Sequence, residues 1–103
     1  MKSIFTITMN YQRALAQANA LDRAAGNLRR IANNNVGGAK ARIRSGWKGD
    51  NGDTAALKAD TLQGKIIASA DNLNRTAETV RRVARNTYEA ERRAWEIARR
   101  RTY

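Results

Sequence analysis

The chain has 103 residues, a length that suits one domain. It lacks proline, cysteine and histidine, which excludes disulfides, thiol nucleophiles, cysteine-based metal sites and the most common general base. Its formal net charge of +11 favours an anionic partner, whether nucleic acid, an acidic membrane surface or an acidic protein.

Residues 1–10 are rich in β-branched residues and alternate weakly. The two alternating sets are Ile4, Thr6 and Thr8, and Phe5, Ile7 and Met9. This pattern predicts an extended arm. The same segment is too short and too polar for a signal peptide, and no run in the chain approaches the roughly 20 apolar residues of a membrane span. Export, if it occurs, is therefore expected to proceed without the general secretory signal.

Two long segments carry an apolar residue every three or four positions, which predicts amphipathic helices over about 11–44 and about 53–101. In the first helix, the asparagines and glycines of residues 33–38 are poor helix formers, so a kink, fraying or a short break is expected there. Three glycines within residues 45–52 predict a tight turn between the helices, and Asp50 or Asp53 could cap the second one. The predicted fold is an all-α, two-helix antiparallel hairpin within a single domain, 1–103.

Alanine dominates both apolar stripes, so one hairpin buries little area and would be marginally stable alone. A second chain that covers the remaining apolar surface would give a dimer that resembles a four-helix bundle. The sequence leaves open whether this is a homodimer or a heterodimer with another helical protein. The predicted partner interface consists of Leu15, Leu21, Leu28, Leu62, Ile66, Leu73, Val80, Tyr88 and Trp95.

Residues 75–101 contain nine arginines and four glutamates. The simplest interpretation is a solvated helix face with pairs such as Glu78 with Arg82 and Glu96 with Arg100. A second is an acidic protein partner. A third, nucleic acid or lipid, is less favoured because the chain shows no helix-turn-helix spacing, zinc ligands or aromatic stacking platform. The candidate electrostatic residues are Arg81, Arg82, Arg85, Arg92 and Arg93.

Trp47-Lys48-Gly49 lies in the predicted turn, near the middle of the chain. A Trp-x-Gly at this place, between two helical segments of a cysteine-free chain of this length, resembles the WXG family of small helical-hairpin proteins. That family is linked to type VII secretion in Gram-positive bacteria. Two roles for Trp47 stay open: its indole covers Ile43 and Leu57 at the end of the hairpin, or a partner recognises it in a groove.

The resemblance implies a non-enzymatic substrate or adaptor that pairs with itself or with a larger helical partner, for example an acidic N-terminal domain of a toxin. It also implies contact with the type VII secretion machinery, with the protein cytoplasmic before export and then secreted or at the cell surface. Trp47 and Gly49 would be the motif residues at the turn.

Secreted members of the family carry a tyrosine followed four residues later by an acid, after the second helix. The nearest tyrosine here is Tyr88, but the fourth residue after it is Arg92, and no acid follows Tyr103 in this sequence. We hypothesise that a bound partner supplies the export signal.

Catalysis is not expected, because Ser3, Ser45 and Ser69 have no evident activating partner. Residues 50–53 contain two aspartates but lack the spacing and the terminal glutamate of a calcium loop. We therefore expect no cofactor and no metal. The alternative function is a basic helical protein that binds DNA or an anionic membrane surface.

Overall fold

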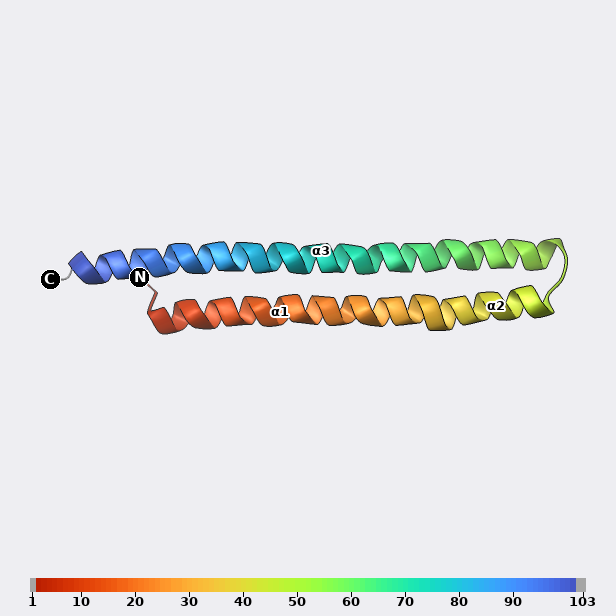
Figure 1. Ribbon diagram of the computed structural model, residues 1–103, viewed down its shortest axis with the longest axis horizontal. Coiled ribbons are helices and arrows are strands. Elements are labelled where there is room, and N and C mark those ends of the chain that lie inside the picture. The colour runs from red at the N-terminus through yellow and green to blue at the C-terminus, as the bar shows by residue number, and fades with distance from the viewer. Residues whose placement is uncertain (1, 102–103) are drawn as a thin grey trace. The chain divides into compact units, whose positions relative to one another are not determined.

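The computed structural model describes residues 2–101, and Met1, Thr102 and Tyr103 lie outside this range. The described chain is helical except at residues 2–3 and 47–49 and contains no strand within this range, which confirms the predicted all-α class. Its elements, in order, are α1 (Ile4–Arg30), the π-helical segment η1 (Ile31–Val36), α2 (Gly37–Gly46) and α3 (Asp50–Arg101) (Figure 1).

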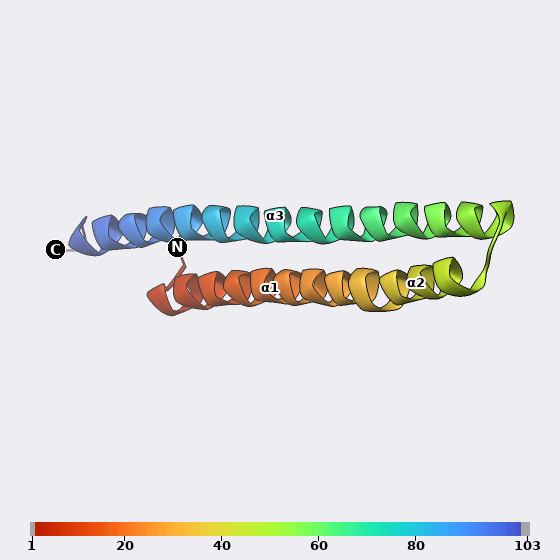
Figure 2. The same cartoon turned by 45° about the vertical axis from the view of Figure 1, so that its right-hand side comes forward.

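The chain groups into two compact units. Unit 1 combines the chain up to Leu21 with the chain from Arg75 onward, and unit 2 is Asp22–Asn74. Within each unit, part of the N-terminal half lies antiparallel beside part of α3 (Figures 1 and 2). Helices α1 and α3 each continue from one unit into the other. The expectation of a single domain stays a prediction.

The extended arm expected over residues 1–10 is wrong, because α1 begins at Ile4. Ser3 starts the helix: its Oγ accepts a hydrogen bond of 3.1 Å from the backbone N–H of Thr6, and its carbonyl accepts one of 3.0 Å from the N–H of Ile7. Serine is a favoured N-cap residue for this reason. The helix buries Ile7, which is 2 % exposed, so packing outweighs the β-branched character of the segment.

The asparagine- and glycine-rich stretch changes the helix without ending it. Residues Ile31–Val36 are π-helical, and the N–H of Gly37 donates to the carbonyl of Ala32, five residues earlier. A π segment inserts an extra residue into a helical turn. The irregularity expected at 33–38 is thus a wider turn that begins at Ile31, and Ala32 remains buried within it.

Within each unit, the most deeply buried side chains are mostly those of alanines. Buried alanines recur every seven residues in the N-terminal half and at intervals of fourteen and seven residues in α3. Seven residues are close to two helical turns, so these alanines lie along one side of each helix. A methyl side chain at the contact lets helices approach closely. Among the described residues, Ile7 is the only larger side chain that is buried to the same degree. This alanine seam comprises Ala18, Ala25 and Ala32 in the N-terminal half and Ala56, Ala70 and Ala77 in α3.

Replacing a seam alanine by leucine should destabilise the fold. We expect Ala70→Leu to lower the free energy of unfolding by about 1–3 kcal/mol, because the added atoms force the helices apart. Ala68→Leu, at an exposed position of the same helix, should change it by less than about 0.5 kcal/mol. Urea unfolding followed by circular dichroism measures both values. Equal effects would contradict the close approach at the seam.

Candidate partner-binding surface

The turn between α2 and α3 is shorter than the predicted 45–52, because α2 continues to Gly46 and α3 begins at Asp50. Trp47 has an extended backbone (φ −120°, ψ 98°), and its N–H donates to the carbonyl of Ile43 at 2.8 Å. Gly49 has φ +96°, a region that glycine adopts without the strain of a side chain. Asp50 and Asp53 lie in the first turn of α3, where acids suit the helix dipole.

Gly52 lets this turn close. It is buried although it lies in the first turn of α3, and a Cβ placed on it would lie 2.1 Å from the Trp47 carbonyl oxygen and 3.2 Å from the indole Cγ. The Trp47 side chain therefore lies beside Gly52 and is still 50 % exposed. Leu57, which the indole was expected to cover, is 64 % exposed, so the geometry leaves both residues largely accessible.

Two flanks run beside the alanine seam. Heptad letters are assigned with Ala18 and Ala25 at position a of α1 and Ala70 and Ala77 at position a of α3. In an antiparallel pair, the e positions of the two helices then face each other on one side, and the g positions face each other on the other side. We name the e side the polar flank. The side formed by the d and g positions is named the apolar flank.

In unit 2, one part of the polar flank is a hydrogen-bonded cluster of four residues. Asn74 donates to Asp22 at 2.7 Å. Arg29 donates to Asn74 at 2.5 Å and to Asp71 at 2.8 Å. These groups join α1 to α3, so this side of the pair is already occupied by its own polar side chains.

A second cluster in unit 2 centres on Asp60. Lys40 donates to Asp60 at 2.5 Å and to Gln63 at 3.1 Å, and Arg44 lies 3.2 Å from the other Asp60 carboxylate oxygen. The hydrogen bond from Lys40, together with the charges of Lys40 and Arg44, lowers the pKa of Asp60, although desolvation acts in the opposite direction. Asp60 thus ties α2 to α3.

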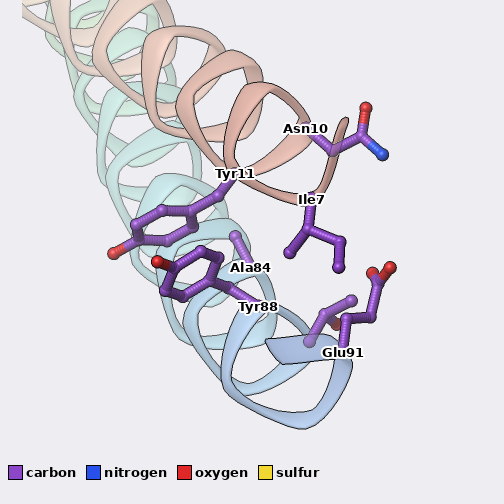
Figure 3. A pocket seen from close by; sticks show the side chains of 7 residues that line it. Ile7, Asn10, Tyr11, Ala84, Tyr88 and Glu91 are labelled. Carbon is purple, nitrogen blue, oxygen red and sulfur yellow. The ribbon is translucent and has the colours of Figure 1, made fainter. Parts of the chain in front are cut away.

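In unit 1, aromatic and polar contacts close the same flank. The rings of Tyr11 and Tyr88 stack with centroids 4.7 Å apart. Figure 3 shows the two rings next to each other at one side of a small pocket, which Ile7 and Glu91 line from the other side. Arg81 donates to Asn19 at 2.9 Å. Tyr88 and Arg81 are therefore used within the hairpin.

The nine residues predicted to form the partner interface divide between the flanks. Leu62 is exposed, at 50 %, and the other eight are half-buried. Three of the nine lie at e positions on the polar flank: Leu15, Tyr88 and Trp95. The other six lie at d or g positions on the apolar flank: Leu21, Leu28, Leu62, Ile66, Leu73 and Val80.

The apolar flank is open in each unit. In unit 2, Ile31 is 44 % exposed, and Leu28, Ile66 and Leu73 are half-buried. In unit 1, Val83 is 53 % exposed and lines a groove whose walls are almost entirely apolar. The groove is formed by Ala14, Thr76, Thr79, Val80, Val83 and Ala84.

The five predicted electrostatic arginines also differ in their contacts. Arg81 is half-buried and pairs with Glu78 at 2.7 Å, so Glu78 pairs with Arg81 and not with Arg82 as predicted. Arg92 lies 3.4 Å from Glu96, the acid that was predicted to pair with Arg100. The remaining three, Arg82, Arg85 and Arg93, are exposed.

The polar flank and the role of Gly52 were not predicted from the sequence. The signal for the flank is present, since alanines at seven-residue spacing define position a in each half and hence the e positions that hold Asp22 and Asn74. Gly52 gives no such signal, because its contact with Trp47 depends on the conformation of the turn.

Comparison of the chain with protein-family models, curated proteins and solved structures gives no match. Across residues 2–101, no three histidine, cysteine, aspartate or glutamate side chains gather as a metal site would require. The helices described for that range include none that is both long enough and apolar enough to cross a membrane.

Two glycines of α3 should respond in opposite ways to alanine. A Cβ added at Gly64 would have no neighbouring atom within 4 Å, so Gly64→Ala should stabilise the protein by about 1 kcal/mol through helix propensity. Gly52→Ala should destabilise it, because the methyl group collides with the Trp47 backbone. Thermal unfolding of both variants tests this, and a stabilising Gly52→Ala would contradict the turn geometry.

The lowered pKa of Asp60 predicts a pH dependence. The charged carboxylate stabilises the folded state above its ordinary pKa of 3.8, and this contribution is lost as the pH falls through the lowered folded-state value. Asp60→Asn should therefore lose less stability than the wild type between about pH 5 and pH 2, and added salt should reduce the difference. Glu89→Gln is the control for removal of one acid. Identical pH profiles for Asp60→Asn and the wild type would contradict the prediction.

Proposed function

We propose that this chain is a non-enzymatic helical hairpin that pairs with another helical chain and serves as a substrate or adaptor of a type VII secretion system. The observation that carries the proposal is the open apolar flank beside a seam made only of small residues. The larger apolar side chains that a two-helix pair would be expected to bury are left half-buried or exposed, as Leu62 and Val83 show.

Pairing follows from the area that this arrangement leaves uncovered. Burial of apolar surface contributes about 25 cal/mol per Å², and a methyl group removes little such surface from water. A second helical chain on the d and g positions would cover residues such as Leu62, Ile66 and Val80 and would complete a bundle of four helices. Helix-on-helix packing of this kind needs no catalytic group and no cofactor.

The link to secretion rests on the resemblance at the turn. Trp47 and Gly49 occupy the connection between α2 and α3, and the half-exposed indole is accessible to a recognising protein. Tyr88 lies inside α3 and stacks on Tyr11, so it does not stand in a tail after the helix. This supports our hypothesis that the partner contributes the export signal.

The alternative is binding to DNA or to an anionic membrane surface, and the exposed Arg82, Arg85 and Arg93 are the observation that favours it. The two functions respond differently to salt. Phosphate-driven binding weakens steeply as salt is added, whereas pairing through apolar surface should persist at about 0.5 M salt. Sedimentation equilibrium of the protein with its binding partner at low and high salt separates them.

Trp47→Ala is the variant that tests recognition at the turn. The indole is half-exposed, so the variant should keep its helicity by circular dichroism while export from a host with a type VII system, or partner pairing, falls by about tenfold. Trp95→Ala is the matched control, because this indole lies at an e position of α3, away from the turn. Unchanged pairing and export in Trp47→Ala would count against recognition at the turn.

A further inference from the structure

We infer that the chain pairing with the apolar flank is an acidic amphipathic helix and not a second copy of this chain. The inference rests on the proposed pairing function and adds the chemical class of the partner. It comes from the distribution of charge around the flank, which differs sharply from the distribution on the rest of the molecule.

On α3, the apolar flank has a purely basic or neutral border. Position c lies next to position g on the surface of a helix. Four of the c positions of α3 hold a lysine or an arginine. No acid occupies c, d or g of this helix, because its eight acids all lie at a, b, e or f. The c positions from the N-terminal end are Asn51, Lys58, Lys65, Asn72, Thr79, Asn86, Arg93 and Arg100, and the four cations among them are exposed.

The N-terminal half brings no carboxylate to this flank either. Residues 1–46 contain one acid, Asp22, and it lies on the polar flank, where it accepts a hydrogen bond from Asn74. The d and g positions of α1 are occupied by small, apolar or amide side chains, among them Ala14, Leu21 and Leu28. The apolar flank therefore has a border of positive charge without a negative group of its own.

The groove in unit 1 shows how apolar and basic surface meet. Thr79 lines the apolar groove together with Val80 and Val83. It also lines the neighbouring surface formed with Arg82, Arg85 and the ion pair of Glu78 with Arg81. A helix that places apolar side chains in the groove would thus hold its own flanking residues within reach of guanidinium groups.

Charge decides between the candidate occupants. A second copy would bring the same cations against this border and would combine two chains of net charge +11, and like charges across an interface oppose association. A helix with glutamates or aspartates beside its apolar stripe would reverse this repulsion. The packing is the helix-in-groove mode, in which apolar anchors supply affinity and flanking charges supply specificity.

An anionic membrane would attract the basic side chains on the border, but it fits the apolar flank less well than a partner helix does. Helices that lie on membranes present protruding tryptophan, phenylalanine and leucine side chains to the lipid. The aromatic residues here lie elsewhere: Trp95 is at an e position, Trp47 is in the turn, and the exposed Phe5 lies at a b position. The groove lined by Val80, Val83 and alanines suits the ridge of a partner helix.

The experiment uses the full chain and two synthetic helical peptides. Both carry leucine at a and d, and one has glutamate whereas the other has lysine at e and g. Fluorescence anisotropy should show the acidic peptide binding at least about tenfold more tightly than the basic one, and sedimentation should show no stable dimer of the chain alone at the same concentration.

Four variants locate the binding site. Val83→Ser and Arg93→Glu, on the apolar flank and its border, should each weaken binding of the acidic peptide by about tenfold. Their controls are Leu57→Ser and Arg99→Glu at exposed b positions, which should change it by less than about twofold. Circular dichroism establishes that all four remain helical.

Four results would overturn the inference. Equal losses in the apolar-flank variants and their controls would indicate non-specific attraction of an acid to a basic protein. Binding to phosphatidylglycerol vesicles that is lost in Val83→Ser would indicate a membrane surface as the occupant. A stable dimer of the chain alone that is disrupted by Val83→Ser would leave the proposed pairing intact and identify a second copy as the partner. Absence of both self-association and peptide binding would contradict the pairing function as well.

Discussion

The whole arrangement depends on the close approach of helices along a seam of alanines. A methyl group at the contact line gives each helix little apolar surface to bury, but it lets side chains on both flanks reach across to the opposite helix. Asp22 and Asn74 meet at 2.7 Å for this reason, and Tyr11 and Tyr88 stack at 4.7 Å. The fold is thus held by polar and aromatic contacts beside the seam as much as by the seam.

The same constraint separates the two flanks by chemistry. On the polar flank, donors and acceptors find partners within the chain, as Lys40 and Asp60 do. On the apolar flank, the larger side chains stay half-buried or exposed, as Leu28 and Val83 do. Exposure of such a surface to water is unfavourable, and its burial against another apolar surface lowers the free energy. The functional proposal follows from this difference between the flanks. The positive charge on the border of the apolar flank favours an acidic partner over a second copy of the chain.

Periodicity in the sequence was sufficient to predict the all-α class and a turn within residues 45–52. It did not predict the start of α1 at Ile4, because the β-branched content of residues 4–8 suggests a strand when packing of Ile7 is ignored. Nor did it separate Leu15, Tyr88 and Trp95 from the apolar flank. A three-to-four residue spacing places a residue near the contact line but does not say on which side of it, and only the seven-residue repeat of the buried alanines resolves the two sides.

The two tryptophans of the chain are distributed one to each unit. Trp47 belongs to unit 2, where its indole is half-exposed beside Gly52. Trp95 belongs to unit 1, where the guanidinium carbon of Arg99 lies 5.4 Å from the centre of its ring. Each indole is therefore an intrinsic fluorophore for one unit, and removal of either one leaves an emission signal that follows the other unit through unfolding or quenching without an attached dye.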